Sequence, residues 1–184
     1  MSSPIQIQNN NLNNKELPHN IEAEQGIIGA ILLNNEIYFE ISDKINADSF
    51  YEPVHRIIYD VISKFISKGQ LATPITLKSY FEVEKNLDEI GGSNYLVRLA
   101  NSAVSLDYAK SYAQIIYDLA VRRGLYELGG KVQHNAIEKN IEVKPEDLIE
   151  DAERQLYQIA EKGSTSTNIH TFQSSVEEAI ELAK

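Results

Sequence analysis

The chain has 184 residues, of which 42% are hydrophobic and 24% charged, and its formal net charge is −10 at pH 7. This length suits one domain with tails, or a domain followed by an extended hairpin, and the composition is typical of a helical protein with a core. Proteins that grip DNA normally need a basic surface to neutralise phosphates, so a chain this acidic is expected to bind DNA weakly on its own.

Residues 1–16 are polar and rich in asparagine, with neither a helical nor a strand period, and they predict a disordered tail. The first helix is predicted to begin at Asn20 or Ile21 and to end at Leu33. Two glutamates in its first turn favour this start, because negative charge is stabilised at a helix N-terminus.

One side of this first helix is nearly bare, because Gly26, Gly29 and Ala30 carry little or no side chain there. A glycine inside a helix costs about 1 kcal/mol relative to alanine. We therefore expect a compensating contact, namely a close crossing by another helix, and not a ligand site.

The clearest amphipathic helix follows Pro53, which the first turn of a helix tolerates, and Gly69 marks its end. Its apolar residues recur at helical spacing and are Val54, Ile57, Ile58, Val61, Ile62, Phe65 and Ile66. Thr73-Pro74 begins a further helix, and Ser93 can cap a short helix that ends near Asn101. Few segments alternate as strands do, so the predicted fold class is all-α.

From Asp107 to about Lys139 the helical pattern is nearly continuous, and after a loop at residues 140–144, Pro145 opens a second helix. Two helices with one narrow apolar stripe each, joined by a short loop, make an antiparallel helical hairpin. A hairpin that projects from a head leaves part of its stripe exposed, which invites a second copy. The candidate dimer-interface residues are Leu125, Leu128, Val132, Ile149, Leu156 and Ile159.

The C-terminal residues predict a linker followed by a helix, since Ser174 and Glu177 have the spacing of a capping box. A helix of about eleven residues is marginal alone in water, so we expect its apolar stripe to dock on another surface. The candidate docking residues are Val176, Ala179, Ile180 and Ala183. The predicted organisation is a disordered tail (1–16), a compact globular helical head (17–124), a helical hairpin (125–162), and a linker with the start of a further helix (163–184).

No pattern of catalytic or metal-binding residues stands out. The nearest approach to a nucleotide-binding P-loop starts at Gly124, but the position that should be lysine is Gly130, and the segment lies inside a helical stripe instead of following a strand. The four histidines lack metal-ligand spacing. His55 is expected to be a helix-face or core residue, and a site residue is the alternative.

Two interpretations of the pair Arg122 and Arg123 stay open: contact with a phosphate or a partner's carboxylate, or an ion pair between helices. Residues 138–161 carry eight carboxylates against three basic side chains, a run that predicts a solvated helix face and should repel nucleic acid.

Nothing in the sequence indicates a membrane or an export route. No apolar run approaches the roughly 20 residues that span a bilayer, and the first sixteen residues lack the regions of a signal peptide. The chain has no cysteine, which excludes disulfides and is compatible with a reducing cytoplasm. We therefore expect a cytoplasmic protein with no membrane partner.

Several short motifs occur in a recognisable order. The matching positions are Pro18, Ala23, Glu24, Gly29 to Leu32, Asp48, Phe50, Tyr51, His55, Ile58 and Tyr59, followed by Gly91 to Leu96 and Arg122 to Leu125. These motifs resemble the N-terminal domain of DnaB-type replicative DNA helicases, whose sequences open with Pro-x-x-x-x-Ala-Glu, Gly-Ala-Ile-Leu and Asp-x-Phe-Tyr-x-x-x-His-x-x-Ile-Tyr. The resemblance covers roughly residues 17 to 162.

The resemblance implies a non-catalytic module for assembly and recruitment in DNA replication. In that family the hairpins pair, the pairs close into a trimer of dimers above the ATPase ring, and this collar docks the C-terminal domain of primase and, in some lineages, a helicase loader. The linker helix, which would begin near Phe172, packs on the neighbouring ATPase domain. ATP and Mg²⁺ act in that ATPase domain, which has no counterpart in this sequence, so no cofactor is implied for this chain.

Other interpretations stay open. The chain can be a stand-alone helical adaptor, or a degenerate truncated product, that binds replication proteins. An enzyme with a carboxylate-based site is a further alternative, although no spacing singles out a pair of carboxylates. A native gene that continues into a P-loop would favour the helicase interpretation over the adaptor.

Overall fold

The computed structural model describes residues 16–85, 88, 91–138 and 144–161, and every regular element among them is a helix. The elements are α1 (Ile21–Leu33), α2 (Glu36–Ile41), the short 3-10 helix η2 (Ala47–Ser49), α3 (Pro53–Ser67), α4 (Pro74–Val83), α5 (Ser93–Asn101), α6 (Leu106–Ile137) and α7 (Pro145–Glu161). The predicted all-α class is confirmed. Residues 1–15 of the tail predicted for 1–16, and the linker and helix predicted for residues 163–184, lie outside the described residues.

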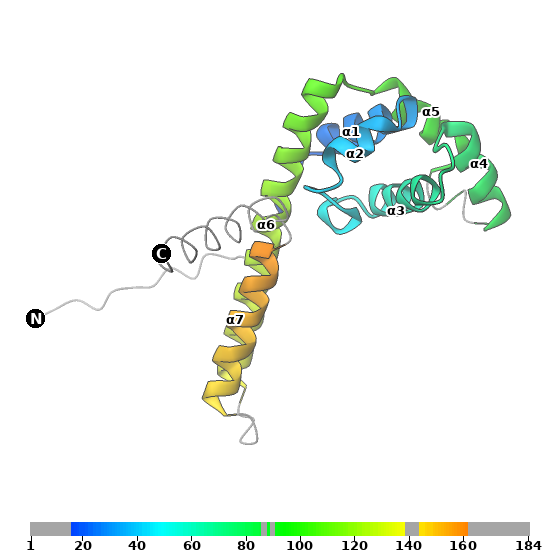
Figure 1. Ribbon diagram of the computed structural model, residues 1–184. Coiled ribbons are helices and arrows are strands. Elements are labelled where there is room, and N and C mark those ends of the chain that lie inside the picture. Colours follow the sequence, from blue (N-terminus) through cyan, green and yellow to red (C-terminus); the bar gives the residue numbers. More distant parts are fainter. Residues whose placement is uncertain (1–15, 86–87, 89–90, 139–143, 162–184) are drawn as a thin grey trace, which may run out of the picture.

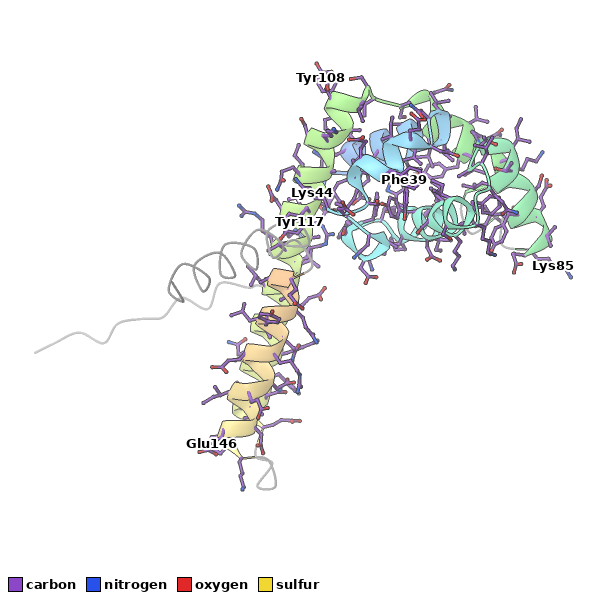
Figure 2. All side chains as sticks on the ribbon, in the orientation of Figure 1. Phe39, Lys44, Lys85, Tyr108, Tyr117 and Glu146 are labelled. Atoms are coloured by element: carbon purple, nitrogen blue, oxygen red, sulfur yellow. The ribbon has the colours of Figure 1, made fainter. Side chains whose placement is uncertain are left out.

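Figure 1 shows a head built from α1 to α5, with the first half of α6 along one side. The second half of α6 extends beyond the head and α7 runs back along it, so the two form an antiparallel hairpin. With 32 residues, α6 is about 48 Å long. Figure 2 shows Tyr108 near one end of this helix, Tyr117 where it leaves the head, and Glu146 at the far end of the hairpin.

Helix α1 begins where the sequence predicted, because the Asn20 side chain accepts a hydrogen bond from the backbone N–H of Ala23 at 3.0 Å. The helix then lies at the centre of the head, packed on α5 and α6, with apolar residues such as Ile27 and Ile31 fully buried. Its central position explains why almost all of its sides are apolar.

Neighbouring helices approach α1 closely on its bare side. A Cβ atom at Gly29 would lie 1.9 Å from the carbonyl oxygen of Leu99 in α5, and one at Gly26 would lie 3.2 Å from the Tyr112 ring in α6. The close helix crossing predicted from these glycines is therefore confirmed.

Helix α3 contributes Ile58 and Ile62 to the same core. The neighbouring Tyr59 is also buried, and its hydroxyl donates a hydrogen bond to the carbonyl of Ile45 at 3.1 Å. Burial, together with the nearby Tyr38, raises the pKa of Tyr59 well above its ordinary value.

Two elements were not predicted, α2 and η2, because both are too short to show a helical period. The Asn35 side chain holds the start of α2. It donates hydrogen bonds to the carbonyl of Ile31 at 2.7 Å and, 37 residues away, to the carbonyl of Ala72 at 2.8 Å, and it accepts one from the N–H of Ala72 at 2.9 Å. The predicted cap at Ser93 was wrong by one residue. Helix α5 begins at Ser93 itself, and the N-cap position is occupied by Gly92 with φ +75°.

No helix in the described part of the chain is long and apolar enough to cross a bilayer.

Replacing Gly29 by alanine should destabilise the head by about 3 kcal/mol or more, because the added methyl group collides with backbone, which cannot move aside as a side chain can. Gly26→Ala is the matched control, since it gains the same helix propensity but meets only side chains. Urea unfolding followed by circular dichroism compares the two. Equal stability of both variants would contradict the crossing seen here.

Candidate assembly surface and its anchor in the head

The hairpin has a narrow inner seam and an open apolar side. Two of the predicted interface residues belong to the seam: Leu128 is buried and also lines the groove described below, and Ile159 packs on Gly124, where a Cβ atom would lie 3.4 Å from its side chain. These residues therefore join α6 to α7 within one chain.

The other four predicted residues are open to solvent. Leu125 and Val132 on α6 are 45% and 43% exposed, and Ile149 and Leu156 on α7 are 59% and 50% exposed. Because the residues of each set are spaced by seven, each set lies along one face of its helix, and the groove that both helices line places these two faces on the same side of the hairpin. Val132, Ile149 and Leu156 line a mainly apolar groove of about 590 Å³ there.

This groove is the candidate assembly surface. The role of its residues as a dimer interface stays a prediction. The candidate docking residues of the C-terminal helix, Val176, Ala179, Ile180 and Ala183, lie outside the described residues.

A buried polar network fixes the head that carries the hairpin. The Glu24 carboxylate, 1% exposed in the middle of the core, accepts hydrogen bonds from the backbone N–H groups of Tyr51 at 2.7 Å and Glu52 at 3.3 Å. His55, completely buried, lies with Nδ1 2.7 Å from the same carboxylate and Nε2 2.7 Å from the Tyr95 hydroxyl. The network thus joins α1, α3 and α5.

A carboxylate, an imidazole and a hydroxyl in this order also occur in the catalytic triads of hydrolases. In this protein their burial gives them a structural role. A substrate cannot reach Glu24 or His55, whose side chains are 2% and 0% exposed. The prediction that His55 is a core histidine is confirmed. Buried polar groups are stabilising only when all of them are paired, and here the pairs cross three helices.

Arg123 ties the hairpin helix to the head. Its guanidinium is 6% exposed and donates hydrogen bonds to the carbonyls of Pro18 at 2.8 Å and Ser49 at 2.6 Å. It also lies 5.7 Å from the centre of the Tyr51 ring. The Tyr51 ring in turn stacks on the His19 ring, with the ring centroids 4.3 Å apart. Burial lowers the pKa of Arg123, and the charge of Glu24 acts in the opposite direction.

The interpretation as an ion pair between helices is wrong for Arg123, because its guanidinium bonds backbone carbonyls and lies over a tyrosine ring. Contact of the arginine pair with a phosphate or a partner's carboxylate stays a prediction. Together with Asn46, Arg56 and Glu127, Arg123 lines a cleft of about 300 Å³ between the head and the hairpin.

The sequence missed how these polar residues combine. Glu24, His55 and Tyr95 all belong to the motifs quoted above, and a glutamate between the apolar residues of a buried helix was the available signal. Its partners Tyr51, Glu52 and His55 are 27 to 31 residues away in the sequence, so spacing could not reveal them. The P-loop-like segment from Gly124 lies inside α6 and forms no loop. Among the described residues no cluster of three or more His, Asp or Glu side chains could hold a metal ion.

Known proteins are similar to this chain in sequence and in fold. The family model described as the DnaB-like helicase N-terminal domain matches residues 16–118, more than half of the chain. The chain belongs to this family. The match covers α1 to α5 and the head half of α6, including every residue of the Glu24, His55 and Tyr95 network.

Relatives of the DnaB family extend the similarity into the hairpin. The replicative DNA helicase DnaB of Rickettsia typhi is 40% identical over 167 residues, which cover 89% of this chain and 34% of that protein. The chain therefore spans about a third of the length of such relatives.

Two solved structures share the fold. The N-terminal domain of DnaB helicase from Mycobacterium tuberculosis, at 25% identity, superposes with a TM-score of 0.72 and covers 78% of this chain and 99% of that one. The structure of a DnaB-like replicative helicase described with its interactions with primase gives a TM-score of 0.61 at 24% identity, and the match covers 86% of this chain and 35% of that one.

Glu24→Ala should destabilise the head by about 3–5 kcal/mol, because the change leaves two backbone N–H groups and a buried histidine without their acceptor. Glu22→Ala is the control: it removes an exposed carboxylate from the same helical turn and should cost less than about 1 kcal/mol. Denaturant unfolding of both variants measures the difference. A loss for Glu24→Ala no larger than that of the control would refute the network's role.

Proposed function

We propose that this chain is a non-catalytic assembly and recruitment domain of a replicative helicase. The observation that carries the proposal is the open apolar side of the hairpin in a chain of the DnaB-like N-terminal family. Exposed apolar surface of this kind commonly marks a protein–protein contact.

The partner of the groove is a second copy of the same hairpin. Two copies related by a two-fold axis place the same patch on both sides, so that one set of exposed residues covers the other. Leu125, Val132, Ile149 and Leu156 supply the contact, while Leu128 lines the groove between the two helices and Ile159 packs on Gly124 within each hairpin.

Within the longer proteins of this family, these dimers would form a trimer of dimers above the ATPase ring. The collar would dock primase and, where one exists, a helicase loader, and the segment after Phe172 would pack on a neighbouring ATPase domain. ATP and Mg²⁺ would act in that ATPase domain. This domain itself would bind DNA only weakly because of its acidic charge.

Leu156→Glu should abolish dimerisation, since pairing would bury a carboxylate without a partner, which costs several kcal/mol. In the single chain Leu156 is half exposed, so the new charge remains hydrated there. Gln158→Glu is the matched control, because it adds the same charge to the same helix two residues away, outside the groove.

Sedimentation equilibrium over a range of concentrations reads out both variants. We expect the wild type and Gln158→Glu to dimerise and Leu156→Glu to remain monomeric. A wild-type chain that is monomeric at high concentration, or a dimeric Leu156→Glu, would exclude the hairpin interface.

Recruitment of primase is the second part of the proposal. A solved relative with the same fold is described with its interactions with primase. We expect the dimer to bind the helical C-terminal domain of the cognate primase through the region 88–162, and the Leu156→Glu monomer to bind it less tightly if the site spans two copies. A folded, dimeric chain that captures no primase domain would contradict this part while leaving the assembly proposal intact.

A further inference from the structure

The two halves of the molecule differ sharply in how much they bury. In the head, α1 buries nine of its thirteen residues, and α3 buries six. In the hairpin, α7 has no buried residue, and the only buried residue of α6 beyond Gly124 is Leu128. A helix in water depends on packing of its apolar face, and the single chain provides little of it here.

The local sequence of the hairpin also disfavours helix. Gly129 and Gly130 are consecutive in the hairpin half of α6, and a Cβ atom added at either one would meet nothing within 4 Å. The other glycines inside helices, at positions 26, 29 and 124, each have a close neighbour that accounts for them. Packing within one chain therefore gives no reason for these two glycines, each of which weakens the helix.

Like charges add to this effect on α7. Glu146 and Glu150, and likewise Asp147 and Asp151, stand four residues apart, so each pair lies on one face of the helix. Arg154 forms an ion pair with Asp151, which leaves the pair of glutamates as the repulsive one. The acids of the first turn are favourable at a helix N-terminus, but those one turn later are not.

We propose that the outer hairpin, residues 125–137 and 145–161, folds only when it pairs with a second copy. This proposal rests on the proposed function, because it takes the second copy as the occupant of the groove. The head folds alone, while folding of the hairpin and association are one equilibrium. Part of the free energy of association is then spent on ordering the hairpin.

This linkage can be measured with a substitution that favours helix but lies away from the groove. Gly130→Ala qualifies, since Gly130 is exposed and two residues from both Leu128 and Val132, on the opposite side of α6. If the hairpin were already folded in the monomer, this change would stabilise monomer and dimer equally and the Kd would not move. If the hairpin folds on pairing, the added helix stability favours only the dimer and lowers the Kd.

Because both protomers carry the substitution, we expect the dimer Kd to fall by about 20-fold. Ser111→Ala is the matched control: it raises helix propensity at an exposed position in the head half of α6, where Ser111 Oγ donates to the Asp107 carbonyl at 3.2 Å, and should leave the Kd unchanged. A Gly130→Ala Kd that stays within about twofold of the wild type overturns the inference.

Hydrogen exchange provides the second measurement. In the Leu156→Glu monomer, and in the wild type diluted below its Kd, amides of 125–137 and 145–161 should exchange at least about tenfold faster than in the dimer, while α1 and α3 keep their protection. Equal protection of the hairpin in monomer and dimer overturns the inference but leaves the dimer itself standing. A wild type that never dimerises overturns the inference and the proposed function together.

Discussion

The contact between α1 and α5 at Gly29 sets the geometry of the head. The backbone of α5 lies so close that no side chain fits between the helices, and this brings Tyr95 of α5 within reach of His55 in α3. The hydrogen bonds from Glu24 through His55 to Tyr95 then require α1, α3 and α5 to be in place at the same time. The lack of space for a side chain at Gly29 and the chain of paired polar groups thus specify the same arrangement of helices. Together they give a small core a unique packing.

The head and the hairpin are stabilised by different physics. The head has a closed apolar core with a satisfied polar network inside it. In the hairpin, Leu128 is buried and Ile159 packs on Gly124, while the outer sides of the two helices remain in water. Arg123 connects the two parts, because its guanidinium bonds head carbonyls from the helix that continues into the hairpin. This division suits a domain whose head keeps its shape while its hairpin depends on a neighbour.

The sequence predicted the long helices well because local signals define their ends. Asn20, Pro53, Gly69 and Pro145 all lie where helices α1, α3 and α7 begin or end. The short elements α2 and η2 could not be predicted, since each has too few residues to show a helical period, and the start of α2 is held by the contact of Asn35 with Ala72, 37 residues away. The apolar stripe of the hairpin was predictable in composition. Which of its members face the partner helix depends on how the hairpin is rotated, and periodicity alone cannot fix that rotation.

The adjacent residues Arg123 and Gly124 have one more consequence. Arg123 holds the carbonyl of Pro18, near the first described residue, and Gly124 receives the side chain of Ile159, near the end of α7. The described chain therefore enters the head and leaves the hairpin beside the same turn of α6. Both ends of the described chain are thus held at one place on the domain. The far end of the hairpin, where α6 ends at Ile137, lies about 20 Å further along that helix.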